Sequence, residues 1–180
     1  MIVRPLPLAG AFVIEPEPIS DDRGFFARLM CRDEFARHGI EADYVQCSVS
    51  YNRRRGIVRG LHYQADPWAE AKLVRCTAGM AFDAIVDLRE DSPTFGRWHA
   101  ETLSAANRWT MVVPRGFAHG FQALEDDTEL FYQISTPYQH DASRGVRWDD
   151  PALGIAWPLP GEIQVSERDR SLPCLHERSP

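Results

Sequence analysis

The sequence predicts an all-β protein, a sandwich or a barrel, from three observations. Most of its 180 residues fall into short apolar runs bounded by Gly, Pro, Asp and Ser. The run Met80–Leu88 is largely apolar and punctuated by Asp, which suits a strand buried on both faces. Helical character is confined to short stretches, so the pattern does not favour the alternating strands and helices of a parallel sheet.

Each strand is expected where a run rich in β-branched, aromatic or alternating apolar residues lies between turn residues. In chain order these segments are Ala11–Ile14, Tyr44–Ser50, Gly56–Tyr63, Ala71–Ala78, Met80–Leu88, Trp98–Leu103, Thr110–Val113, Gly120–Ala123 and Glu129–Ser135.

One short helix is expected over Arg32–His38, where Gly39 provides a C-terminal stop, and another helical turn near the C-terminus. Turns are expected at Asp91–Thr94 and Ser104–Asn107, because Pro, Asn and Ser favour turn dihedrals. Residues 176–180 have no apolar period and are expected to be frayed or disordered.

Length and charge narrow the classes of function. We expect residues 1–180 to form one domain, because a chain of this length suits a single core. The net charge of −6 provides no basic stripe for nucleic acid. The four cysteines have no regular spacing, so we expect reduced thiols rather than disulfides or a zinc site. No signal-peptide pattern or membrane-length apolar run is present, which indicates a cytoplasmic protein without a membrane partner.

A histidine, a lysine and a tyrosine suggest proton-transfer chemistry. In the expected strand around His62, alternation places Val58, Gly60 and His62 on one face and Arg59, Leu61 and Tyr63 on the other. A histidine facing a cavity is a suitable base near neutral pH, and the Lys72 ammonium could stabilise an enolate. Tyr132 could serve as the acid. Singly, these residues are more often a core histidine, an exposed lysine and a packed aromatic, so the argument depends on their occurring together.

His119, in a Pro-x-Gly-x-x-His turn, raises the alternative of a metal-binding cupin barrel. The usual first cupin motif supplies two histidines, whereas this chain reads His62-Tyr63-Gln64, so a metal site is under-supplied with ligands. We therefore expect no metal. The sequence also lacks GxSxG, P-loop and GxGxxG motifs, so it predicts neither a hydrolase nor a nucleotide cofactor site, and we expect no cofactor.

Taken together, the motifs resemble those of the dTDP-4-dehydrorhamnose 3,5-epimerase family over about Ile2 to Pro173. The segments that carry the resemblance are Asp22–Phe26, Arg59–Gln64, Lys72–Arg75, Asp87–Arg89, Ser92–Gly96, Pro114–Phe121, Gly154–Pro158 and Ser166–Asp169.

The resemblance implies a cupin-type jelly-roll β-barrel with a few short peripheral helices. It implies a homodimer that exchanges N-terminal strands, and an epimerase that needs neither metal nor nicotinamide. His62 matches the family's general base and Asp169 the carboxylate that pairs with it. Lys72 matches the residue that stabilises the enolate oxygen, and Tyr132 the acid that reprotonates from the opposite face.

The resemblance also implies a nucleotide-sugar site. Arg59, Gln46 and Arg23 match contacts to the diphosphate, with Arg23 donated across the dimer. The other residues expected to bind the substrate are Phe26, Arg28, Ser48, His119, Tyr138 and Arg168.

Two departures from the family pattern bear on the substrate. Arg28 replaces a glutamate that helps to read thymine, and Ser48 replaces an asparagine near the phosphate and sugar. The expected reaction is epimerisation at C3 and C5 of a dTDP-4-keto-6-deoxyhexose. A mono-epimerase acting at C3 or C5 only, an epimerase for a sugar on another nucleotide, and a non-catalytic nucleotide-sugar binding barrel remain as alternatives.

Overall fold

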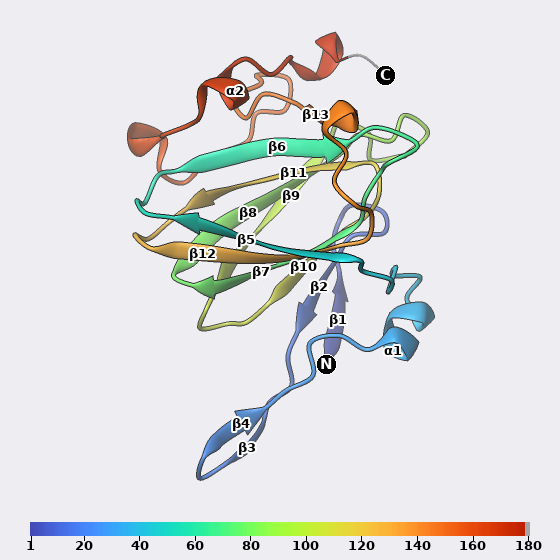
Figure 1. Cartoon of the computed structure of the whole chain (residues 1–180), viewed down its shortest axis with the longest axis vertical. Helices are drawn as coiled ribbons and strands as arrows, with labels where there is room; N and C mark the ends of the chain where they lie inside the picture. Colours follow the sequence, from blue (N-terminus) through green and yellow to red (C-terminus); the bar gives the residue numbers. More distant parts are fainter. Residues whose placement is uncertain (179–180) are drawn as a thin grey trace.

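The computed structural model describes residues 1–178, which form an antiparallel jelly-roll of two facing sheets (Figure 1). One sheet has six strands in the order β1-β2-β10-β7-β12-β5, and the other has five in the order β13-β6-β11-β8-β9. A separate hairpin pairs β3 with β4. The all-β prediction is therefore confirmed.

The elements have the following bounds. The strands are β1 Ile2–Pro5, β2 Phe12–Glu15, β3 Ile19–Asp21, β4 Gly24–Phe26, β5 Gln46–Asn52, β6 Val58–Gln64, β7 Lys72–Ala78, β8 Met80–Asp87, β9 Trp98–Ser104, β10 Thr110–Val113, β11 Phe117–Ala123, β12 Thr128–Ile134 and β13 Ser143–Gly145. The helices are α1 Arg32–Arg37 and α2 Glu167–Arg170, with 3-10 turns at His140–Ala142, Pro160–Glu162 and Leu175–Glu177.

The main core lies between the two sheets. Alternate residues of each strand turn inward, so apolar side chains from both sheets meet and are removed from water. The six-stranded sheet contributes Val13, Val74, Met111 and Leu130, and the five-stranded sheet contributes Ile85, Leu103, Phe117 and Phe121.

The outer faces of the sheets are covered unequally. The C-terminal segment crosses the five-stranded sheet, where Leu153 and Leu175 pack against Leu61 of β6 (Figure 1). On the six-stranded sheet, Phe35 of α1 covers one end. Towards the β5 edge, Val49 and Tyr51 are 58% and 51% exposed, so part of this face has no covering layer among residues 1–178.

The β3–β4 hairpin projects away from the two sheets (Figure 1). Its side chains have little protection from solvent, and Ile19 and Phe26 are 76% and 77% exposed. An arm of this length with exposed apolar residues does not bury them within its own chain.

The structure confirms the segments expected as strands within a few residues, together with α1 and both turns. Gly39 follows α1 with φ +68°, the left-handed conformation that glycine accommodates most easily. The strands β1, β3, β4 and β13 were not predicted, because they have only three or four residues and little alternation. The helical turn expected near the C-terminus is α2.

The prediction of a frayed end at 176–180 was wrong for its first residues. His176 and Glu177 lie in a 3-10 turn, and the Arg178 side chain donates to the Leu88 carbonyl at 3.2 Å. Tertiary contacts thus order a segment that has no apolar period of its own. Residues 179 and 180 lie outside the described residues.

The prediction for strand alternation in β6 was also wrong. Val58 packs outward against Trp157, whereas Arg59 and His62 both line a cavity on the inner side. The pairing of β6 with β11 shifts register between His119 and Phe121. The shift occurs beside Gly60, whose φ of +127° is the conformation that favours glycine.

Close approach of two strands explains why this position is glycine. A Cβ atom on Gly60 would lie 2.6 Å from the Cα of Gly120, and one on Gly120 would lie 2.7 Å from the carbonyl oxygen of Arg59. Neither backbone could yield easily, so both glycines are needed for the shifted register that brings Arg59 and His62 to one side.

All four cysteines are free thiols, as predicted. Within residues 1–178, no helix has both the length and the apolar character that crossing a membrane requires.

Candidate active site

A cavity of about 280 Å³ opens between the two sheets. It brings together seven of the residues predicted from the sequence, which come from five strands and one loop: Gln46, Arg59, His62, Lys72, His119, Tyr132 and Tyr138. Glu70, Phe121 and Ile134 complete its lining and were not predicted as site residues.

His62 forms a pair with Asp169 at the edge of the cavity. The His62 Nε2 atom lies 2.7 Å from Asp169 Oδ1, and the backbone N–H of Gly60 donates to Asp169 Oδ2 at 3.2 Å. Burial opposes the charge of Asp169, but the hydrogen bond and charge of His62, with the Gly60 N–H, hold the pKa of Asp169 below its ordinary value. The carboxylate is therefore ionised at neutral pH and fixes the imidazole.

Local sequence places Asp169 for this contact. Ser166 caps the N-terminus of α2, and its side chain accepts the backbone N–H of Asp169 at 3.1 Å. The helix packs against β6, so Asp169 reaches the strand beside Gly60. Spacing alone gave no indication of this pair, because 107 positions separate the two residues.

A second histidine pair lies deeper in the cavity. His119 Nε2 is 2.7 Å from Asp83 Oδ1, and both side chains are almost fully buried. The Tyr132 ring meets the His119 ring edge-on, with centroids 5.8 Å apart. Burial, with a smaller contribution from the charge of Asp83, raises the pKa of Tyr132 well above its ordinary value. Tyr132 is therefore a protonated phenol at neutral pH.

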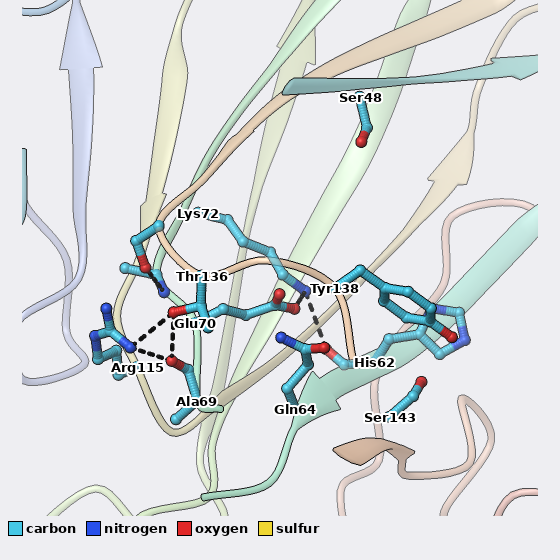
Figure 2. Close-up of polar contacts among 12 residues, drawn as sticks. Ser48, His62, Gln64, Ala69, Glu70, Lys72, Arg115, Thr136, Tyr138 and Ser143 are labelled. Carbon is cyan, nitrogen blue, oxygen red and sulfur yellow. Dashed lines mark hydrogen bonds and ion pairs between the residues drawn. The ribbon is translucent and has the colours of Figure 1, made fainter. Parts of the chain in front are cut away.

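Lys72 enters the cavity beside His62 (Figure 2). Its Nζ atom lies 2.9 Å from Glu70 Oε1 and 3.4 Å from the His62 carbonyl oxygen. Glu70 was not predicted as a site residue. Its position gave a signal, because residues two apart in an extended segment face the same side, and Glu70 is two residues before Lys72. The site thus contains a carboxylate as well as a cation.

The mouth of the cavity is polar. Arg59 donates to Asn52 Oδ1 at 2.8 Å and to the Tyr51 carbonyl, which fixes a guanidinium at the rim. Gln46 accepts the backbone N–H of Tyr138 at 3.1 Å. Ser48 does not line the cavity itself, but it lies opposite Tyr132 in the pairing of β5 with β12 and accepts a hydrogen bond from Gln46 at 3.4 Å. These groups suit an anionic, hydroxyl-rich ligand.

Four predicted residues lie elsewhere in this chain. Arg23 is on the projecting hairpin and pairs with Asp21 at 2.6 Å, and Phe26 is on the same hairpin. Arg28 pairs with Glu34 of α1 at 3.0 Å. The remaining one is Arg168, whose side chain donates to Ser143 Oγ at 2.7 Å without lining the cavity.

A protein-bound metal ion needs several donor side chains grouped at one place. Within residues 1–178, no three His, Cys, Asp or Glu side chains are grouped so that they could hold a metal ion. His62 and His119 each have their Nε2 atom beside a carboxylate.

Comparisons with known proteins agree on one family. The family model described as dTDP-4-dehydrorhamnose 3,5-epimerase matches residues 5–177. The chain is 42% identical to the dTDP-4-dehydrorhamnose 3,5-epimerase of Sinorhizobium fredii, over 98% of this chain and 91% of that protein.

Solved structures give the same result. The crystal structure of dTDP-4-dehydrorhamnose 3,5-epimerase from Elizabethkingia anophelis matches with a TM-score of 0.96 and 36% identity, over 99% of this chain and 98% of that one. The structure of the 3′-monoepimerase ChmJ of Streptomyces bikiniensis, in complex with dTDP-quinovose, matches with a TM-score of 0.88 and 35% identity, over 96% of this chain and 87% of that one. The cupin-type jelly-roll, the cavity and this agreement establish that the chain belongs to the dTDP-4-dehydrorhamnose 3,5-epimerase family.

Proposed function

We propose that the protein epimerises C3 and C5 of a dTDP-4-keto-6-deoxyhexose. A ketone at C4 acidifies the protons on both neighbouring carbons, so a base can remove a proton and an acid can return one to the other face. The observation that carries this proposal is that one cavity is lined by the carboxylate-paired His62, the protonated phenol of Tyr132 and Lys72. Family membership supports the same reaction.

His62 is the proposed base. Its Nε2 atom faces Asp169, which leaves Nδ1 to accept the substrate proton. The Asp169 carboxylate then stabilises the imidazolium that forms, as a carboxylate does for histidine in hydrolases. His62 is also partly exposed, with 36% of its side chain accessible, so a substrate in the cavity can reach it.

Lys72 and Tyr132 are proposed to complete the reaction. The Lys72 ammonium stabilises the negative charge on the C4 oxygen while the enolate exists. Tyr132 gives its phenolic proton to the carbon. A phenol is protonated at neutral pH even at its ordinary pKa of about 10, and burial, which raises the pKa of Tyr132 further, keeps it in that form until the enolate accepts the proton. No cofactor is required, because each carbon loses and regains a proton without a change in oxidation state.

We propose that Arg59, Gln46, Ser48, His119, Tyr138 and Arg168 bind the nucleotide sugar. Arg23, Phe26 and Arg28 are proposed to reach the same site from a second copy of the chain in a homodimer that exchanges N-terminal strands. The exposed β3–β4 hairpin and the uncovered apolar surface at Val49 and Tyr51 support this arrangement. Free thiols on all four cysteines support a cytoplasmic location.

The dimer can be tested by complementation. An Arg23→Ala chain and a His62→Ala chain should each be inactive as pure dimers. When the two are unfolded together and refolded as a mixture, some activity should return, because a mixed dimer has one site with both native residues. If each site uses only its own chain, the mixture stays inactive.

A mono-epimerase is the second candidate. Ser48 lies opposite Tyr132 and is shorter than the asparagine usual in the family, so the side chain beside the proposed acid is smaller. The chain is also similar to a 3′-monoepimerase. A sugar held in a different orientation would present one carbon rather than two to His62. Arg28 stands where the family has a glutamate that helps to read thymine. A substrate sugar carried on another nucleotide is therefore a further alternative.

Solvent exchange separates these outcomes. The protein is incubated with dTDP-4-keto-6-deoxyglucose in deuterated water, and deuterium at C3 and C5 is followed by NMR. Deuterium at both carbons is expected. Deuterium at one carbon would identify a mono-epimerase, and no deuterium would direct the test to sugars on other nucleotides. A thermal shift with dTDP but no exchange on any 4-keto sugar would indicate a binding barrel. Loss of exchange with a chelator, together with stoichiometric metal, would indicate a metal enzyme.

A further inference from the structure

We propose that Glu70 is a positioning residue that holds Lys72 in the cavity with one side of its ammonium directed at the substrate oxygen. The inference rests on the proposed function for Lys72. It adds a carboxylate to the site, and it explains why the chain uses lysine at this position.

Lys72 is the only lysine in the sequence, and the other members of the 20 Lys and Arg residues are arginines. Apart from the histidines, arginine therefore supplies every other basic side chain, including Arg59 at the mouth of the same cavity. A lysine differs by its compact ammonium on a flexible four-carbon stem, whereas arginine presents a planar fork. A point charge suits a single enolate oxygen, but its flexible stem must be held.

Glu70 supplies the counter-charge. The Lys72 and Glu70 side chains are only 9% and 10% exposed, and Nζ lies 2.9 Å from Oε1. A cation at this depth without a partner would lose most of its hydration without compensation. The ion pair with Glu70 supplies that compensation. The compensation matters for catalysis, because only a positively charged ammonium can stabilise an oxyanion electrostatically.

The geometry around Nζ leaves one direction open. An ammonium has three N–H donors. Glu70 and the carbonyl oxygen of His62 occupy two directions, from different strands or loops (Figure 2). Within residues 1–178, Nζ makes no other hydrogen bond or ion pair, and Lys72 lines the cavity, so the third donor is available to a ligand there.

The segment that carries Glu70 is fixed on both sides (Figure 2). The Ala69 carbonyl accepts hydrogen bonds from Arg115 and from Thr136 Oγ1, and Thr136 Oγ1 in turn accepts from Arg115 at 2.9 Å. The next residue, Ala71, donates its backbone N–H to Ser135 Oγ at 2.9 Å. Because its neighbours are tied to β10–β11 and to the end of β12, Glu70 is a rigid support for Lys72.

The test compares Glu70→Ala and Glu70→Gln with the wild type. The alanine variant removes the carboxylate, and the glutamine variant keeps an oxygen acceptor without the charge. Glu162→Gln is the matched control, because Glu162 is a half-exposed carboxylate paired with Arg55 at 2.8 Å and is outside the cavity. Activity is measured as kcat and KM, and dTDP binding by calorimetry.

The single lysine provides a readout that does not depend on activity. In protein labelled with ¹⁵N-lysine, only Lys72 can give a side-chain NH₃⁺ signal. A buried, paired ammonium exchanges slowly with water, so the wild type and Glu162→Gln should show this signal at neutral pH. Both Glu70 variants should lose it through faster exchange.

We expect kcat to fall by about 10- to 100-fold in both Glu70 variants, with KM and the Kd for dTDP within about threefold of wild type. A kcat within twofold of wild type, or an unchanged NH₃⁺ signal, would overturn the proposal. A rise in KM alone would assign Glu70 to binding and also overturn it. If the wild type incorporates no deuterium at C3 or C5 of any 4-keto sugar, the proposed function fails. The Lys72 NH₃⁺ signal still decides in that case whether Glu70 holds Lys72.

Discussion

The cavity region contains two histidine–carboxylate pairs, whose histidines lie on the neighbouring strands β6 and β11 and whose surroundings differ. His62 on β6 and His119 on β11 are opposite each other in register, and each has Nε2 2.7 Å from an aspartate oxygen. The His62 side chain is 36% exposed and its aspartate is also bonded by Gly60, whereas the His119 side chain is 4% exposed. Asp83 Oδ2 is buried and finds no hydrogen-bond donor within residues 1–178.

The difference shows that the same pair of groups can serve two purposes. Proton transfer to a substrate requires an accessible imidazole and a carboxylate that remains ionised, and the His62 pair has both. The His119 pair is almost fully buried, its imidazole lines the inner part of the cavity, and its ring contacts the Tyr132 ring. We infer that the outer pair moves protons and the inner pair positions the acid.

The largest expected effect is that of His62→Ala. Removing the base should lower kcat about 10⁴-fold, at the upper end of the range for general acid–base catalysis, and leave the Kd for dTDP unchanged within about threefold. Single-turnover assays and calorimetry measure the two quantities. Wild-type turnover in this variant would eliminate the outer pair as the proton-transfer pair.

Tyr132→Phe is expected to have the next largest effect. The phenol is lost while the ring and its contact with His119 remain, so kcat should fall about 10³-fold with little loss of stability. Deuterium loss from a substrate labelled at C3 or C5 should fall less than product formation, because abstraction by His62 is retained. Equal losses in both assays would contradict separate roles for base and acid.

Matched Asp→Asn variants compare the two pairs directly. Asp169→Asn should lower kcat about 10²-fold, because the imidazole loses its orienting carboxylate. Asp83→Asn should instead lower the free energy of unfolding by about 1 kcal/mol, because the buried hydrogen bond between His119 and a carboxylate is replaced by a weaker one to a neutral amide oxygen.

Chemical denaturation and steady-state kinetics of both variants make this comparison. If the kinetic effects are reversed, with Asp83→Asn the less active protein, the inner pair would be the site of proton transfer.

The smallest expected effect is on acid stability. The pKa of Asp169 is lowered in the folded protein, so its contribution to stability is fully present above its ordinary value of 3.8 and is lost as the pH falls through the lowered value. Asp169→Asn should therefore lose less unfolding free energy than wild type when the pH is lowered from about 5 to about 3. Urea denaturation at both pH values tests this, and parallel losses would contradict it.

Much of the fold could be predicted from local patterns. Strands β5 to β12 have turn residues at their ends and apolar residues within, so their type follows from neighbours in sequence. Short strands such as β3, β4 and β13 are defined by their hydrogen bonds to a partner strand, and their own three residues give little signal.

The candidate site was predicted in part by motif and in part by resemblance. His62, Lys72 and His119 stood out in short motifs, whereas Asp169 was identified only through the family resemblance. Glu70 was missed, because a glutamate two residues before a lysine is common on any exposed strand.

The sequence alone thus determined the strands, the turns and the chemical groups, because these depend on residues a few positions apart. The family resemblance named the pair of His62 and Asp169, but only the tertiary structure shows how distant groups are brought together. The close approach of Gly60 and Gly120 shifts the register of β6 and brings Arg59 and His62 to one cavity. The packing of α2 against β6 brings Asp169 to His62 across 107 positions. Contacts of this kind depend on backbone packing between distant segments, which no local period encodes.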